Sequence, residues 1–163
     1  MVQVEIINIG DELLIGQVVN TNASQMAQKL NSYGFNVLAT SIIGDNQNQI
    51  RKSLDIALKR ADCVLITGGL GPTKDDITKK TLAEYFKSDL IIDKEVEEHV
   101  KSYFKRKQLP FTETNRAQAL VPEKCKVIFN PVGTAPGMCF EKNGKLIVSM
   151  PGVPFEMRLM MEK

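Results

Sequence analysis

The most constraining feature of this chain is a short apolar run followed by three glycines in four positions. Residues 63–66 have the sequence CVLI, and residues 67–73 have the sequence TGGLGPT. A continuously apolar run of this length is typical of a strand buried on both faces of a parallel sheet. Apolar residues then recur at helical spacing from Ile77 to Phe86. The segment therefore predicts a strand, a glycine-rich turn and a helix whose N-terminus can receive an anion.

Two adjacent carboxylates, Asp75 and Asp76, are expected in the first turn of that helix. On one interpretation Thr73, Asp75 and Asp76 only cap the helix, because polar and acidic residues are favoured there. On the other, the glycine amides and the acids face a phosphate-bearing ligand. This stretch alone leaves both interpretations open.

The rest of the chain alternates strand and helix patterns. Strands are predicted at 2–9, 35–43 and 63–66, and an amphipathic stripe from Ile50 to Ala61 predicts a helix between the last two. This alternation favours right-handed βαβ crossovers and a mainly parallel α/β sheet. An Asn-Gly pair inside residues 138–150 predicts a C-terminal antiparallel hairpin.

Less regular patterns fill the remaining segments. Residues 13–16 suggest an apolar loop or bend, a charged helix opens at 93 and stops at Pro110, and a short helix is expected over 113–120. We expect residues 1–163 to form one domain. Because the last helical pattern is cut short at Lys163, this domain is expected to be the N-terminal part of a longer protein.

Composition excludes several classes of protein. The 21 basic and 19 acidic residues are nearly balanced, so nucleic acid is not an expected partner. The three cysteines are an odd number without C-x-x-C spacing, which disfavours a disulfide framework or structural zinc site. No apolar run approaches the roughly 20 residues that a membrane span needs. We therefore expect a cytoplasmic protein that does not associate with membranes.

Three predicted strands end in glycine followed by polar residues. These ends have the sequences GDE at 10–12, GDN at 44–46 and GGLG at 68–71. In an open parallel sheet, ligands bind outside the carboxyl ends of the strands, near the point where the strand order reverses. We therefore expect Asp11, Asp45 and Asp76 to converge on one crevice, although each Gly-Asp pair alone could equally be a strand-end turn with a helix cap.

Several standard chemistries are not indicated. The sequence lacks the G-x-x-x-x-G-K-[ST] phosphate loop, the G-x-G-x-x-G fingerprint and the G-x-S-x-G elbow. His99 is the only histidine, and its place beside an apolar stripe suggests a structural or surface residue. Carboxylates and backbone amides remain, a combination that suits a divalent cation bridging a phosphate or pyrophosphate.

Four motifs together resemble a known family. They are GDELL at 10–14, TGGLGPTKDDIT at 67–78, NPVGTAPG at 130–137 and PGVP at 151–154. In this order they resemble the N-terminal domain of the CinA competence/damage-inducible protein family, within the molybdopterin-binding superfamily that includes MoaB and MogA. The resemblance covers essentially the whole chain. It implies a three-layer α/β/α sandwich whose crevice binds a pterin or a nucleotide pyrophosphate.

The resemblance also implies an activity. Members similar to this domain hydrolyse ADP-ribose to AMP and ribose 5-phosphate with a divalent metal such as cobalt, assisted by potassium, and eukaryotic relatives act on FAD. Magnesium is an equally acceptable metal for such a site. Longer members carry a C-terminal domain that deamidates nicotinamide mononucleotide, but no residue of this chain corresponds to it.

The same resemblance assigns residue roles. Asp45 and Asp76 match two catalytic aspartates that would hold the metal or orient the attacking water, and Asp11 matches an acid beside them. By the residue pattern itself, the glycine-rich turn would cradle a phosphate, and the two late Pro/Gly turns would form the opposite wall. The expected substrate-binding residues are Gly68, Gly69, Gly71, Thr73, Asp75, Asn130, Gly133, Thr134, Pro151 and Gly152.

The leading hypothesis is therefore a metal-dependent pyrophosphatase that acts on ADP-ribose or a related dinucleotide such as FAD. One alternative is a protein of molybdenum-cofactor synthesis that binds molybdopterin and activates it with ATP. Another is a non-catalytic nucleotide-binding or oligomerisation domain of a CinA-type protein. Relatives form dimers or trimers, so self-association is expected in each case.

Overall fold

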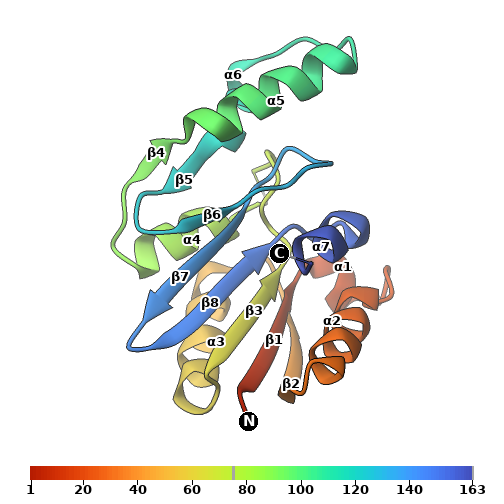
Figure 1. The fold of residues 1–163 in the computed structure, drawn as a ribbon, viewed down its shortest axis with the longest axis vertical. Helices are drawn as coiled ribbons and strands as arrows, with labels where there is room; N and C mark the ends of the chain where they lie inside the picture. Colours follow the sequence, from red (N-terminus) through yellow and green to blue (C-terminus); the bar gives the residue numbers. More distant parts are fainter. Residues whose placement is uncertain (75, 163) are drawn as a thin grey trace.

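The computed structural model describes residues 1–74 and 76–162 of the chain. These residues form a six-stranded sheet in the order β2-β1-β3-β8-β7-β6 (Figure 1). The strands of this sheet are β1 Gln3–Ile9, β2 Asn36–Ile43, β3 Cys63–Thr67, β6 Lys126–Ile128, β7 Gly137–Lys142 and β8 Lys145–Met150.

The sheet is mixed. Strand β1 pairs in parallel with β2 and β3, and β3 pairs in parallel with β8. Strand β7 then runs antiparallel to both β8 and β6, which forms the hairpin that the Asn-Gly turn predicts. The apolar side chains of β3 are buried because β1 and β8 flank this strand and helices cover both faces.

Helices cover the two faces of the sheet. Helices α2 (Thr21–Ser32) and α7 (Pro154–Met160) pack on one face, where Met26 of α2 and Met157 of α7 share a buried cluster with β1 residues. Helices α3 (Gln47–Arg60) and α4 (Thr78–Tyr85) pack on the other face, with a second buried cluster. The predicted α/β fold of three layers is confirmed.

A smaller unit extends beyond the end of the main sheet (Figure 1). It consists of β4 (Leu90–Ile92), α5 (Lys94–Arg106), α6 (Glu113–Arg116), the 3-10 helix η1 (Ala117–Ala119) and β5 (Leu120–Pro122). Strands β4 and β5 pair antiparallel, and the unit has its own small buried cluster centred on helix α5. The sequence predicts its helices but not these strands, because three residues carry no readable periodicity.

One local prediction is wrong. Residues 11–14 form a single helical turn, α1 (Asp11–Leu14), where the sequence suggests that an apolar loop or bend follows Glu12. The turn forms because the Gly10 carbonyl accepts hydrogen bonds from the amides of both Leu13 and Leu14. Within residues 1–74 and 76–162, none of the helices combines the length and apolar character that crossing a lipid bilayer requires.

Candidate functional site

The strand order reverses between β1 and β3. The chain passes from β1 to β2 on one side of β1, and then returns to form β3 on the other side. The carboxyl ends of these strands lead into Gly10 and Gly68, which therefore lie at the position where open parallel sheets bind ligands.

The glycine-rich turn depends on its glycines. Gly68 and Gly69 have φ angles of +101° and +66°. A Cβ on Gly68 would collide with the carbonyl oxygen of Ile9, and one on Gly69 would collide with the hydroxyl of Thr78. Glycine at these two positions therefore lets the turn pack closely against β1 and α4.

The Asp76 carboxylate closes the next turn. It accepts hydrogen bonds from the amide of Thr73 (2.9 Å) and from the hydroxyl of Thr73 (2.5 Å). A Cβ on Gly71 would lie 2.6 Å from Asp76 Oδ2, so the third glycine makes room for this carboxylate.

The sequence places Asp76 in the first turn of the helix, and that placement is wrong. Helix α4 begins at Thr78 after the N-cap residue Ile77, which makes no side-chain capping bond. The Thr78 amide donates to the Gly69 carbonyl, so the turn itself occupies this helix terminus. Asp75, which the sequence also places there, lies outside the described residues.

Asp11 and Asp45 connect the ends of β1 and β2 through two reciprocal hydrogen bonds. The Asp11 amide donates to Asp45 Oδ2 (3.1 Å), and the Asp45 amide donates to Asp11 Oδ1 (3.2 Å). Gly44 permits this, since a Cβ there would lie 2.5 Å from Asp11 Oδ1. Burial raises the pKa of Asp45, and the charges of Asp11, Glu12 and Asp76 raise it further, against the lowering effect of the Asp11 hydrogen bond. The structure thus joins the turns of Asp11 and Asp45, whereas the Asp76 carboxylate is bonded within the glycine-rich turn to Thr73.

The donor set limits what kind of metal could bind. Within the described part of the chain, no group of three or more His, Cys, Asp or Glu side chains is arranged to hold a metal ion. A magnesium-type ion needs only one or two protein carboxylates when phosphates and water complete its octahedral shell. Of the predicted acids, Asp11 and Asp45 are bonded to one another's amides and Asp76 to Thr73, so any ion here would share carboxylates that already accept hydrogen bonds.

A cavity of about 340 Å³ lies beside the glycine-rich turn. Its walls come from the turn, from η1, from the loop before β7 and from the segment after β8. It is lined by Leu70, Gly71, Pro72, Asp76, Gln118, Thr134, Ala135, Pro151, Gly152, Val153 and Glu156. The predicted residues Gly71, Asp76, Thr134, Pro151 and Gly152 therefore lie together, whereas Gln118 and Glu156 are additions from the structure.

Asn130 lies in the wall but does not face the cavity. It is only 2% exposed. Its Oδ1 accepts from the amides of Val132 and Gly133, and its Nδ2 donates to the Ala135 carbonyl and to Glu156 Oε2. These four bonds use the full capacity of the amide. The structure thus places Asn130 where it shapes its own loop and holds Glu156.

Gly133 also supports the wall. A Cβ there would collide with the Glu156 carboxyl group, and the Gly133 carbonyl lies 2.9 Å from His99 Nε2. His99 packs edge-on against Phe129, with ring centroids 4.6 Å apart. The prediction that His99 is a structural residue agrees with these contacts.

Lys79 is a half-buried cation that the sequence does not single out. It lies on α4, and its Nζ donates to the carbonyls of Ala117 (3.4 Å) and Gln118 (3.3 Å). Burial lowers its pKa to about 8, while the charge of Asp76 acts in the opposite direction. A lysine within an amphipathic helix gives no sequence signal of such a contact, because its partners come from a segment nearly forty residues away.

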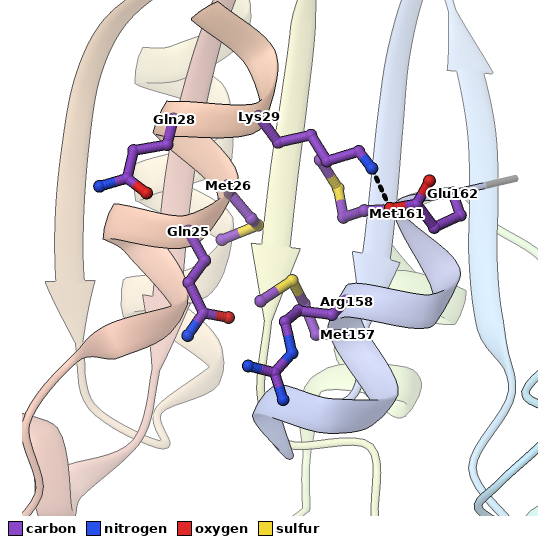
Figure 2. Close-up of a pocket in the computed structure, with 8 residues that line it drawn as sticks. All are labelled: Gln25, Met26, Gln28, Lys29, Met157, Arg158, Met161 and Glu162. Carbon is purple, nitrogen blue, oxygen red and sulfur yellow. Dashed lines mark hydrogen bonds and ion pairs between the residues drawn. The ribbon is translucent and has the colours of Figure 1, made fainter. Parts of the chain in front are cut away.

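Two other hollows flank this region. One of about 150 Å³ lies between α1, the start of α2 and the glycines Gly68 and Gly152, with Asn22 Nδ2 donating to the Gly152 carbonyl. The other, about 380 Å³, lies between α2 and α7, where methionine side chains face one another and Lys29 forms an ion pair with Glu162 (Figure 2). The residues lining the second hollow include none of the predicted site residues.

Comparison with known proteins identifies a matching family and similar sequences. The profile of the family described as "Probable molybdopterin binding domain" matches residues 5–163. A CinA-like protein of Flavobacterium psychrophilum is 50% identical over 161 residues, which cover 96% of this chain and 38% of that protein. The chain therefore spans well under half the length of this relative.

Two solved structures have folds similar to that of this chain. The crystal structure of the protein CinA, of unknown function, from Thermoplasma acidophilum has a TM-score of 0.87 and 34% identity, covering 98% of this chain and 94% of that one. MoaB, a molybdopterin biosynthesis enzyme of Thermus thermophilus, has a TM-score of 0.64 at 20% identity, covering 99% and 88% of the two chains. The second similarity concerns the fold alone.

Proposed function

Because the chain belongs to the family of probable molybdopterin binding domains, with CinA-type relatives, we propose that it binds a phosphorylated pterin or nucleotide at the carboxyl ends of β1 and β3. The observation that carries this proposal is the turn at Gly68 and Gly69. Its two glycines adopt positive φ angles at the point where the strand order reverses, beside a cavity of about 340 Å³.

The proposal gives the glycine-rich turn and the cavity different tasks. The Gly68 amide donates to the Met150 carbonyl, so the amides of Gly69 and Gly71 would be the donors that the turn offers to a phosphate. The cavity is large enough for a ring system and combines apolar walls with a few polar groups, as ligand sites usually do. The whole ligand would then extend from the turn into the cavity.

Calorimetry tests this proposal. The chain should bind at least one of molybdopterin, ADP-ribose and FAD, and the variant G71A should bind it at least about tenfold more weakly, because the new Cβ displaces the Asp76 carboxylate. G144A is the matched control, since nothing lies within 4 Å of a Cβ at Gly144. If the wild-type chain binds none of the three compounds, the proposal is wrong.

A second candidate function is metal-assisted hydrolysis of the pyrophosphate in ADP-ribose or FAD, which gives AMP and a second phosphate product. The specific observation in its favour is that Asp11 and Asp45 are joined at the strand ends and that the charge of Asp76 contributes to the raised pKa of Asp45. Asp45 and Asp76 would hold a divalent ion such as cobalt or magnesium, which would polarise the phosphoryl oxygen and favour ionisation of water, and potassium would assist.

The chain's own residues would then position the reactants. The bonds between Asp11 and Asp45 fix the Asp45 carboxylate at the end of β2, and Thr73 fixes that of Asp76. D45N and D76N keep an acceptor oxygen for these bonds and remove only the charge. Each should therefore lower hydrolysis of ADP-ribose by at least about a hundredfold while the fold remains intact.

An assay for AMP release with cobalt or magnesium, with and without potassium, separates the candidates. D89N is the control, because Asp89 is an exposed acid of the same charge. Wild-type turnover in D76N would refute the hydrolytic role. Ligand binding without turnover under every metal would instead favour a non-catalytic binding domain of a CinA-type protein.

Self-association also belongs to the proposal. We expect a dimer or trimer, measured by sedimentation equilibrium with and without ligand. A mass of 18.2 kDa at all concentrations would correspond to a monomer and exclude it.

A further inference from the structure

Gln118 is almost completely buried, yet it lines the cavity. Its exposed fraction is 2%, and its Oε1 accepts a hydrogen bond from the hydroxyl of Thr134 (3.2 Å). Its Nε2 has no hydrogen-bond partner among residues 1–74 and 76–162. This nitrogen is not among the buried polar atoms that lack a partner, so it reaches open space, and its N–H groups are available to a ligand in the cavity that Gln118 lines.

The position of Gln118 is fixed from two directions. The Lys79 ammonium on α4 donates to its backbone carbonyl, and Thr134 on the loop before β7 holds its side-chain oxygen. The next residue, Ala119, is fully buried in the core of the small unit with Val96 and Val100. The amide N–H groups are thus presented by a rigid frame, as a recognition residue requires.

Glu156 supplies a complementary acceptor. Its Oε2 accepts from Asn130, while the group packs against Gly133, the residue directly before Thr134. Gln118 and Glu156 are therefore held by consecutive residues of one loop, and both line the same cavity. The cavity combines one open amide donor with the carboxylates of Glu156 and Asp76, which repel phosphate.

We propose that this cavity takes the ring end of the ligand, with Gln118 donating to a ring carbonyl or ring nitrogen and Glu156 accepting from a neighbouring ring N–H or amino group. Pterins, flavins and purines all carry such adjacent acceptors and donors, and a volume of about 340 Å³ accommodates a fused ring. The phosphates then lie toward Gly68 and Gly69. This inference rests on the proposed function and assigns the two ends of its ligand.

Equilibrium binding of separated ligand halves tests the assignment. The ring probes are pterin, riboflavin and adenosine, and the phosphate probes are ribose 5-phosphate and pyrophosphate. Q118E keeps the shape of the side chain and the bond from Thr134 but replaces the donor with a carboxylate. It should weaken the ring probe that the wild type binds best by at least about tenfold and leave the phosphate probes unchanged.

Two further variants make the result decisive. E156Q keeps an acceptor for Asn130 and turns an amide donor toward the cavity, so it should also weaken binding of the ring probe. If Q118E has a much lower Tm than the wild type, E156Q serves as the test variant in its place. Q108E makes the same chemical change at an exposed position of the small unit and should behave as wild type.

The outcomes separate the inference from the proposed function. The inference would be overturned if both Q118E and E156Q bound the ring probe as strongly as the wild type does. It would also be overturned if these variants lost affinity only for ribose 5-phosphate. A wild-type chain that binds phosphate probes but no ring probe would overturn the inference alone. A chain that binds neither kind of probe would overturn the proposed function with it.

Discussion

Replacing Asn130 with alanine should destabilise the domain strongly, although Asn130 is not among the residues that line the cavity. The substitution removes four hydrogen bonds at a position that is 2% exposed. It leaves the amide of Gly133 and the carbonyl of Ala135 without their side-chain partner, and both residues are buried. It also releases the Glu156 carboxylate from its only described donor.

The expected loss in the free energy of unfolding can be worked out from these four hydrogen bonds. A typical intramolecular hydrogen bond contributes about 1 kcal/mol net, and a buried group left unpaired costs about 1–3 kcal/mol. Val132 is half-buried, so water can partly replace its bond. The free energy of unfolding should therefore fall by about 3–4 kcal/mol. For a domain of this size that corresponds to a loss of about 10 °C in Tm.

Urea unfolding and a thermal melt measure this loss directly. The control is N31A, because Asn31 is exposed on α2 and its side chain makes no hydrogen bond to the described residues. A loss below about 1 kcal/mol in N130A, together with weaker ligand binding, would refute the reasoning. It would show that Asn130 faces the ligand, as the sequence predicts.

G68A should destabilise the domain by several kcal/mol, because Gly68 has a φ of +101° and a Cβ would collide with the Ile9 carbonyl, whereas G144A, with a φ of +74° and open space, should lose only about 1 kcal/mol. Equal Tm values for the two variants would contradict this. Lys79 should make the free energy of unfolding depend on pH. Its pKa is about 8 in the folded chain and 10.5 in the unfolded chain, so between pH 8 and pH 10.5 the Lys79 side chain binds a proton more strongly in the unfolded chain. The free energy of unfolding should rise with pH in that window, and K79M should lack this contribution in urea titrations at pH 8 and 10.

The strand ends are the part of the site that the sequence could predict. Strand and helix periodicities are local, and a parallel sheet brings the carboxyl ends of its strands to one edge. Asp11 and Asp45, 34 residues apart, could therefore be expected to meet, and the structure joins their turns. The hairpin was equally readable, because Asn143 and Gly144 adopt the positive φ angles that such a turn requires.

The rest of the site depends on long-range contacts that leave no local pattern. Gln118 and Lys79 lie in segments that look like ordinary helix, and their roles arise only when η1 packs beside α4. For Asn130 the sequence motif predicts a ligand contact, but the side chain instead accepts hydrogen bonds from amides of its own turn. Sequence periodicity describes which face is buried and does not describe which buried polar groups pair.

The cavity wall that carries Gln118 belongs to a unit with its own small core of Val96, Val100 and Ala119. The opposite walls belong to the main sheet and its larger cores. Backbone amides in the small unit should therefore exchange with deuterium through openings of lower free energy than those in β1 or β3. A ligand that bridges the cavity would couple the two cores and slow this exchange, so saturating ligand should protect residues far from any direct contact with it.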